Sequence, residues 1–498
     1  MNRLFLFLAL SGVMITGCGM FEPIPGIISA TYKDGTRVPA AVTLTAGQEI
    51  TIEVTAIFPW IVEKCAELPA WLSVTPKSGC VGTQEVTIKV TEELLGAQYT
   101  ILFLAGIERL RLTVKQPAAT FTVTYDANGG GGTPPTDDNE YALGEEVTVK
   151  EQGAITAPDN HAFAGWNTQA DGSGDFYDEG DTFTITGNTI FYAYFEEIGS
   201  SAKNPILIND ETDLRALATD VNAGDNKLNK HYKLINDILL TGDWTPIGNW
   251  ASNNSNYHFC GTFDGNGKEI HGLSVTGDND YAGLFGVIGA NGTVTSLGVS
   301  GTVNGASNVG GIAGLVNNNG KIEHCWASVS VSGTGSNIGG VAGTVRGTVT
   351  NCYATGAVSG TNSVGGVAGY VGGALTNCYA TGDVTGNDNV GGVAGYVFSG
   401  TLTNCAALNP NVSGNNGVER VVGNFFSATI SNNVAWVGMS GSFDGYGENG
   451  ADISSANISV DGTIGDRFTN ANGWTTANGK LPGLFGNTVT LPTHLRQP

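Results

Sequence analysis

The sequence predicts an all-β chain of several modules that ends in a right-handed parallel β-helix. Glycine is abundant, with 74 residues against 16 prolines and no collagen-like period, which is typical of many tight turns between short strands. Hydrophobic residues make up 41% of the chain and charged residues 13%, a balance that excludes a disordered chain. A repeat of fewer than 30 residues recurs in the C-terminal half, and 498 residues are too many for one compact β domain, so we expect a solenoid preceded by smaller modules.

The N-terminus predicts an exported lipoprotein. Arg3 precedes an apolar run over residues 4–15 that is too short to span a bilayer, and Ile15-Thr16-Gly17-Cys18 follows. These four residues resemble a lipobox, where bacterial lipoprotein signal peptides are cleaved and the cysteine is lipidated. The resemblance implies removal of residues 1–17 and a lipid on Cys18, the alternative being an ordinary signal peptide with an incidental cysteine. We expect a tether over 18–26 and a cell-envelope location, at the outer membrane.

Residues 27–117 predict an Ig-like β-sandwich, because apolar and polar residues alternate in four segments: 42–44, 50–54, 86–90 and 110–114. The segment 69–76, Ser78-Gly79 and the closing 112–116 resemble the BACON domain, found in Bacteroidetes surface proteins. That resemblance implies a spacer or a carbohydrate-binding module. Trp71 is a conceivable ligand contact, but we expect it in the core, where a strand-opening tryptophan usually packs. Cys65 and Cys80 share this module and predict a disulfide in an oxidising compartment.

Residues 119–197 predict a second small module. The strand 121–125 runs into Asn128-Gly129, followed by Phe163-Ala164-Gly165-Trp166 and a closing strand at 190–193. This pattern closely resembles the Listeria–Bacteroides repeat, which implies a β-grasp-like fold and occurrence in surface and adhesion proteins. Asn-Gly turns supply the positive φ that hairpins need, so they require no ligand. We expect Phe163 and Trp166 in the small core.

Residues 202–498 predict the β-helix with terminal caps. Asp210 begins a helix whose Leu214, Leu217 and Val221 share one face and which Gly224 ends; such a helix can cover the open end of a solenoid. The motif Val-Gly-Gly-(Ile/Val)-Ala-Gly then recurs, and its last glycine stands at Gly286, Gly314, Gly343, Gly369, Gly395 and Gly423.

Units of 26 to 29 residues are too short to be domains and must bury one another. Their glycines and β-branched residues exclude helical repeats, so we expect one coil of a parallel β-helix per repeat. Over 259–425 the motifs resemble the GLUG repeat of large bacterial surface proteins. Some of those proteins carry peptidase parts, but the metal-binding helix motif of such a peptidase is missing from this sequence.

Three columns follow from this register. The cysteines at 325, 352, 378 and 405 would stack at about 4.8 Å, either as buried thiols or as inter-coil disulfides. The asparagines just before or near them predict a hydrogen-bonded ladder at a turn: Asn351, Asn377, Asn404 and Asn432.

An aromatic strip follows the cysteines directly: Trp326, Tyr353 and Tyr379. If it faces outward, it can pack against sugar rings. Val349 and Cys352 are three residues apart, however, so either a bend intervenes or the strip faces the interior. Both readings stay open from the sequence.

Catalysis is disfavoured because residues 281–423 contain only seven charged side chains, whereas glycosidases need two suitably placed carboxylates and lyases need a base. The net charge of −23 argues against nucleic acid as a partner, and the scattered histidines and the run Asp278-Asn279-Asp280 lack the spacing of a metal site. We expect no metal and no cofactor.

The expected function is a non-catalytic, lipid-anchored envelope protein whose β-helix serves adhesion or glycan binding, with a glycan or a host or surface protein as partner. The alternatives are a β-helix lyase or glycosidase and a structural spacer in a surface assembly.

Overall fold

The structure is a computed structural model that describes residues 28–56, 59–63, 67–92, 96–106, 108–250 and 254–496. Cys18, the signal sequence and most of the tether lie outside the described residues. Cys80 is exposed, whereas Cys65, its predicted disulfide partner, also lies outside them. The chain divides into two compact units: one holds the N-terminal sandwich with most of the second module, and the other holds the solenoid.

The N-terminal module is a β-sandwich, as the alternating segments predict. One sheet has the order β1 (Ile28–Thr31), β3 (Glu49–Ala56), β7 (Gly82–Val90), β5 (Leu72–Thr75); the other has the order β2 (Ala41–Thr43), β9 (Glu108–Lys115), β8 (Gln98–Ala105), β4 (Trp60–Val62), β6 (Ser78–Gly79). The inner faces meet in one apolar core that includes Trp60, Phe103 and Trp71. Trp71 is therefore a core residue, as expected.

The second module is built around a small mixed sheet. Its order is β11 (Val123–Asp126), β19 (Thr189–Glu197), β16 (His161–Asn167), β17 (Phe176–Tyr177), and β11 pairs with β19 in parallel. Three two-stranded pairs complete it: β10 (Thr120–Phe121) with β13 (Tyr141–Ala142), β12 (Gly131–Thr133) with β15 (Ala154–Thr156), and β14 (Glu146–Thr148) with β18 (Thr182–Thr184). Trp166 is fully buried, whereas Phe163 is only half-buried, so the expected core placement holds fully for the tryptophan alone.

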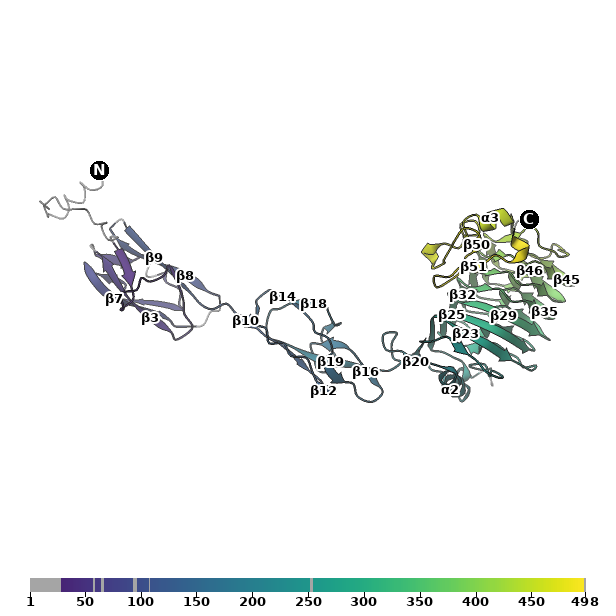
Figure 1. Cartoon of the computed structure of the whole chain (residues 1–498), viewed down its shortest axis with the longest axis horizontal. Helices are drawn as coiled ribbons and strands as arrows, with labels where there is room; N and C mark the ends of the chain where they lie inside the picture. The colour runs from purple at the N-terminus through teal and green to yellow at the C-terminus, as the bar shows by residue number, and fades with distance from the viewer. Residues whose placement is uncertain are drawn as a thin grey trace. The chain divides into compact units, whose positions relative to one another are not determined.

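The third region is a parallel β-solenoid of about 8 turns across residues 206–435, seen as stacked strands in Figure 1. It begins with β20 (Ile206–Ile208), β21 (His231–Leu234), β22 (Ile238–Leu239), β23 (Thr262–Val275) and β25 (Thr293–Gly305). Helix α2 (Glu211–Asn222) packs Leu214, Leu217 and Val221 into the same core, and Figure 1 shows it at the end of the stack opposite the C-terminal helix α3 (Ser455–Ser459). The predicted capping helix is confirmed.

Each later coil contributes strands to three faces of the solenoid. The first face stacks β26 (Val309–Gly310), β30 (Ser336–Gly339), β35 (Asn362–Gly365), β40 (Asp388–Gly391) and β45 (Asn416–Glu419). The second stacks β24 (Phe285–Ile288), β27 (Ala313–Val316), β31 (Ala342–Val345), β36 (Ala368–Val371), β41 (Ala394–Phe398) and β46 (Val422–Phe426).

The remaining strands form the long third face. They are β28 (Lys321–Glu323), β32 (Thr348–Thr350), β37 (Ala374–Thr376), β42 (Thr401–Thr403) and β47 (Thr429–Ser431), then β29 (Trp326–Gly333), β33 (Tyr353–Ala354), β38 (Tyr379–Ala380), β43 (Ala406–Ala407) and β48 (Val434–Trp436), with β34 (Val358–Ser359), β39 (Val384–Thr385), β44 (Val412–Ser413) and β49 (Ala451–Ile453). Beyond them, β50 (Lys480–Leu481) pairs with β51 (Val489–Thr490).

The motif glycines explain why the coils can stack so closely. A Cβ added to Gly343 would lie 2.4 Å from the carbonyl carbon of Asn308, and one added to Gly369 would lie 2.3 Å from that of Asn337. Both neighbours are backbone atoms of the preceding coil, which adopts positive φ at these asparagines. The recurrent glycine is therefore a packing requirement of the solenoid.

Candidate functional site

The interior column of cysteines is confirmed. Asn351 adopts φ 54° between β32 and β33, and this bend lets Val349 and Cys352 both point inward, although they are three residues apart. Cys325, Cys352, Cys378 and Cys405 are fully buried free thiols, so the inter-coil disulfides do not form. Burial raises the pKa of the Cys325 and Cys378 thiols well above the ordinary value, which disfavours the reactive thiolate.

The asparagine ladder at this bend also forms. The side-chain amide of each member donates to the side-chain oxygen of the previous one, from Asn377 to Asn351, Asn404 to Asn377 and Asn432 to Asn404. His324 meets Asn351 at one end (3.1 Å), and Arg467 donates to Asn432 at the other (3.0 Å). The column is a structural element that satisfies polar groups along the turn.

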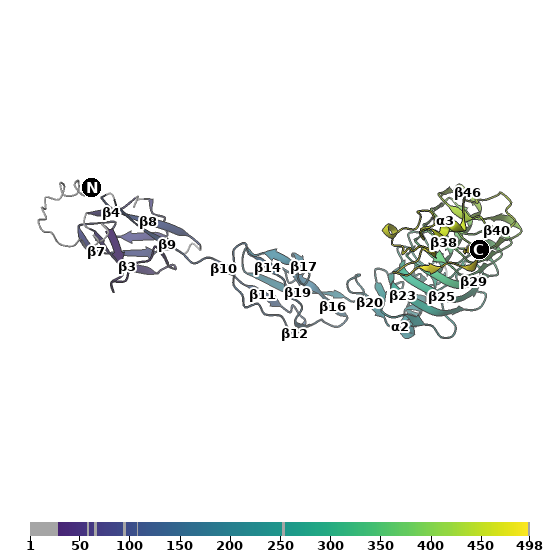
Figure 2. The same ribbon diagram turned by 45° about the horizontal axis from the view of Figure 1, so that its top comes forward.

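The predicted aromatic strip lies outside the coil interior, but another part of the chain covers its rings. Tyr353 stacks on Tyr379 with ring centroids 5.0 Å apart and on Trp326 at 6.1 Å. The C-terminal segment packs over these rings through Phe468 and Trp474, and Figure 2 shows this yellow segment against the solenoid strands.

The exposed fraction decides the role of this strip. Tyr379 is 0% and Tyr353 7% exposed, and the Tyr379 hydroxyl donates to the Pro482 carbonyl at 2.6 Å. The expectation that Trp326, Tyr353 and Tyr379 contact a glycan is therefore corrected: the rings anchor the C-terminal segment, and a sugar cannot reach Tyr379 while that segment is in place.

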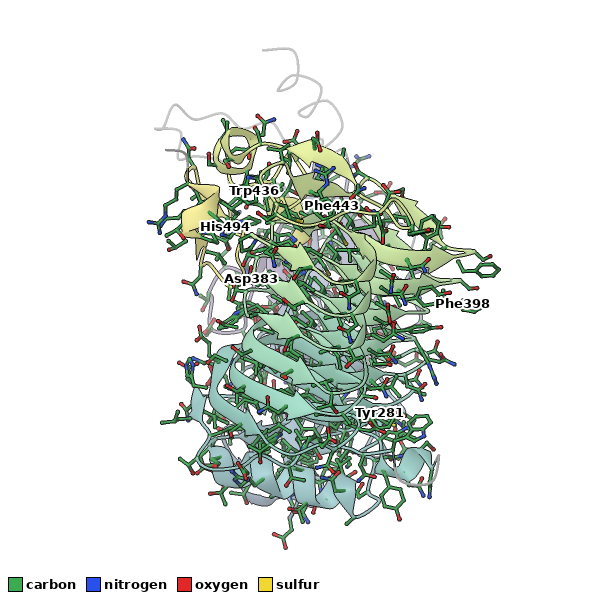
Figure 3. All side chains as sticks on the ribbon, turned by 90° about the vertical axis from the view of Figure 1, so that its right-hand side faces the viewer. Tyr281, Asp383, Phe398, Trp436, Phe443 and His494 are labelled. Atoms are coloured by element: carbon green, nitrogen blue, oxygen red, sulfur yellow. The ribbon has the colours of Figure 1, made fainter. Side chains whose placement is uncertain are left out.

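A different aromatic row lies on the second face of the solenoid, where two phenylalanines are exposed and two tyrosines are half-buried. Tyr370 lies 6.0 Å from Tyr396, Tyr396 lies 6.4 Å from Phe398, and Phe398 stacks on Phe426 at 5.7 Å. Phe398 projects away from the solenoid in Figure 3. The stacking of the two tyrosines could have been predicted from the sequence, because Tyr370 and Tyr396 each follow the last glycine of a motif copy.

A cleft of about 530 Å³ opens near the N-terminal end of the solenoid. Three segments line it: the end of α2 at Asn222, the loop 243–249 and the turn 275–282, which contribute Asp243, Trp244, Asn249, Asn279, Asp280 and Tyr281. Its floor is ordered by hydrogen bonds, since the Asn222 amide donates to the Pro246 carbonyl at 2.9 Å and the Asn249 amide donates to Asn222 at 3.2 Å. Trp244 is buried beneath the cleft, and its indole donates to the Leu284 carbonyl.

Tyr281 supplies the aromatic wall of this cleft. It adopts φ 61°, is half-buried, and stacks on Trp250 at 5.7 Å; Trp250 in turn stacks on His258 at 4.9 Å. Figure 3 places Tyr281 on the same side of the solenoid as Phe398. His258 is buried, and burial lowers its pKa. Stacking against Trp250 restricts rotation of the Tyr281 ring, which lowers the entropy cost of binding a ligand against it.

The chemistry available in the cleft is mainly hydrogen bonding and ring stacking. Asp243 and Asp280 are exposed carboxylates, and Asp280 accepts the Ser307 amide at 2.9 Å. Asp383, which Figure 3 labels on the opposite side of the solenoid from Tyr281, and Asp388 do not line the cleft. In the part of the chain that the structure describes, no group of three His, Cys, Asp or Glu side chains is arranged to hold a metal ion.

Comparison with family models confirms two of the resemblances. Residues 121–194 match the Listeria–Bacteroides repeat domain, and residues 360–385 match the GLUG motif. The BACON resemblance of residues 27–117 stays a prediction.

The chain is also similar to proteins named as membrane proteins and to halomucin. A Gly-rich membrane protein of Evansella cellulosilytica is 33% identical over 158 residues, which cover 27% of this chain and 17% of that protein. Halomucin of Haloquadratum walsbyi is 28% identical over 305 residues, which cover 57% of this chain and 3% of halomucin. The chain thus spans only a small part of these relatives. No solved structure matches, and none of the described helices is long and apolar enough to cross a membrane.

Proposed function

We propose that this chain is a non-catalytic cell-surface protein whose solenoid binds a glycan in the cleft beside Tyr281. The observation that carries the proposal is the composition of the cleft: one stacked aromatic ring lies beside amide and carboxylate side chains. Sugars present apolar C–H faces and many hydroxyls, so they are recognised by this combination of stacking and hydrogen bonds. The volume of the cleft is within the range of small-ligand sites.

The proposed location is the cell envelope, with a lipid on Cys18 as the attachment. Two features support it: the apolar run that leads into Ile15-Thr16-Gly17-Cys18, and relatives that are named as membrane proteins. In this arrangement the N-terminal sandwich, with its BACON-like segment, and the Listeria–Bacteroides repeat domain lie between the lipid and the solenoid along the chain.

A glycan and mucin array with the full chain carrying Cys18→Ser tests the function. We expect binding to at least one glycan class and a loss of at least about fivefold with Tyr281→Asn, since ring stacking contributes about 1 kcal/mol. Asparagine tolerates the positive φ of this position and occupies it in other coils, as at Asn308 and Asn337, so the variant removes the ring and keeps the backbone.

The matched control is Tyr446→Asn, which removes a tyrosine that is 73% exposed and does not line the cleft. Equal binding by the two variants contradicts the cleft as the site. An array without any bound glycan contradicts the proposal and favours the structural spacer.

Hydrolysis or elimination is the second candidate, because Asp243 and Asp280 both line the cleft. Incubation of the bound polysaccharide with the protein, followed by measurement of reducing ends and of unsaturated uronate, distinguishes the two functions. We expect no release above a buffer control. Release that is lost in both Asp243→Asn and Asp280→Asn would establish an enzyme instead.

A further inference from the structure

The two ends of the solenoid differ in how much of the core is covered by other parts of the chain. Helix α2 covers the first coils, whereas among the described residues no element covers part of the last coil. Two contacts cover other parts of the last coil. The Asp444 carboxylate accepts hydrogen bonds from β45, and Glu448 forms a backbone bridge with Val422 at the start of β46. Further along the chain, β49 pairs with β48. The residues between these two contacts, Asn424–Ser431, form a segment that we name the open end.

Interior positions become exposed at the open end. Phe425 continues the buried column that contains Val397, and Ile430 continues the column that contains Leu402. Val397 and Leu402 are fully buried, whereas Phe425 is 40% exposed and Ile430 is only partly buried. Phe426 beside them is 61% exposed. The core of the solenoid thus reaches solvent here.

The backbone edge of the open end is also unpaired among the described residues. β46 pairs with β41 and β47 with β42 on one side only, apart from the bridge between Val422 and Glu448. Natural edge strands are usually protected by charged side chains, prolines or a covering element. The sequence Asn-Phe-Phe-Ser-Ala-Thr-Ile-Ser over residues 424–431 has none of these.

The charge pattern indicates what covers this edge. The chain has a net charge of −23, yet no charged residue lies between Arg420 and Asp444. Two copies of so acidic a chain repel one another wherever charged surfaces meet, and a neutral apolar segment is where they can meet without that repulsion. A basic partner, in contrast, would favour the acidic remainder of the surface over this segment.

We propose that the open end is a self-association surface, on which β46 and β47 of one chain pair with the same strands of a second copy around a two-fold axis. Such a contact is isologous, so it closes at two chains. Head-to-tail stacking is disfavoured because α2 packs over the core at the other end. The pairing hydrogen-bonds the free edge and buries Phe425 and Phe426 against their counterparts.

Sedimentation velocity of the full chain tests this proposal. Cys18→Ser removes the acylation site, and a reducing agent prevents cross-linking through the exposed Cys80. We expect a dimer at micromolar concentration and a dissociation constant at least about tenfold higher for Phe426→Lys, because each copy then buries an unpaired ammonium group. Leu239→Lys is the matched control, since Leu239 is 67% exposed in β22 near the other end, and it should leave the dimer unchanged.

Salt provides an independent readout. Raising ionic strength from about 0.1 M to about 1 M shortens the Debye length from about 10 Å to about 3 Å, which weakens the repulsion between two acidic chains, so the dimer should tighten. A wild-type chain that stays monomeric at both salt concentrations overturns the proposal. A dimer that survives both Phe425→Lys and Phe426→Lys overturns it as well, whatever the glycan array shows.

Discussion

Replacing Gly369 by alanine should loosen the solenoid between its neighbouring coils. The added Cβ would lie 2.3 Å from the carbonyl carbon of Asn337 and 2.3 Å from the amide nitrogen of Ile338. Carbon atoms pack at about 3.5 Å, so the two coils must separate by about 1.2 Å at this point. Both obstacles are backbone atoms, which cannot rotate away as a side chain can.

The cost follows from the bonds that join these coils. The amides of Val341 and Ala342 donate to the Val367 carbonyl at 2.9 and 3.1 Å, and a further 1.2 Å takes both beyond hydrogen-bond range. A buried polar group without a partner costs about 1–3 kcal/mol. Losing both bonds therefore destabilises this part of the solenoid by about 2–6 kcal/mol.

Hydrogen–deuterium exchange resolved by mass spectrometry measures the effect locally, which matters because a solenoid need not unfold in one step. We expect faster exchange in residues 336–371 of Gly369→Ala. The control is Gly372→Ala, whose new Cβ meets only the movable ring of Tyr370, at 3.1 Å. Equal exchange in the two variants would refute the role assigned to the motif glycine.

Three further predictions concern other parts of the solenoid. Tyr379→Phe leaves the buried Pro482 carbonyl without its donor, so the C-terminal segment should lose about 1–3 kcal/mol, seen as faster exchange at 480–485, with glycan binding unchanged. Asn404→Ala should lower the melting temperature more than Asn404→Gly, since both remove the two ladder bonds of Asn404 but only alanine is strained at φ 58°. Burial lowers the pKa of His258 below its ordinary value; the folded state therefore loses stability as pH falls from about 6.5 through the lowered pKa, so protection from exchange at 257–260, corrected for the intrinsic pH dependence of exchange, should fall over that range.

Much of the solenoid could be predicted because its determinants repeat. The spacing of the motif glycines gave the coil lengths, and the strand registers agree: Val309, Ile338, Val364 and Val390 stand in one column. The buried cysteines and the asparagine ladder followed from the same register. Tyr281 was missed because its coil carries only a loose copy of the motif.

The sequence alone determined which side chains stack, because in-register coils place equivalent residues above one another whatever lies around them. It also determined the β-rich modules, since alternation and turn residues act over a few positions. Only the tertiary structure decided which stacked rings meet solvent. Trp326, Tyr353 and Tyr379 are covered by a C-terminal segment that has no repeat, and the cleft beside Tyr281 joins three segments distant in sequence. Such contacts depend on where segments outside the repeat pack on the solenoid. Those segments have no periodic pattern from which their position could be predicted.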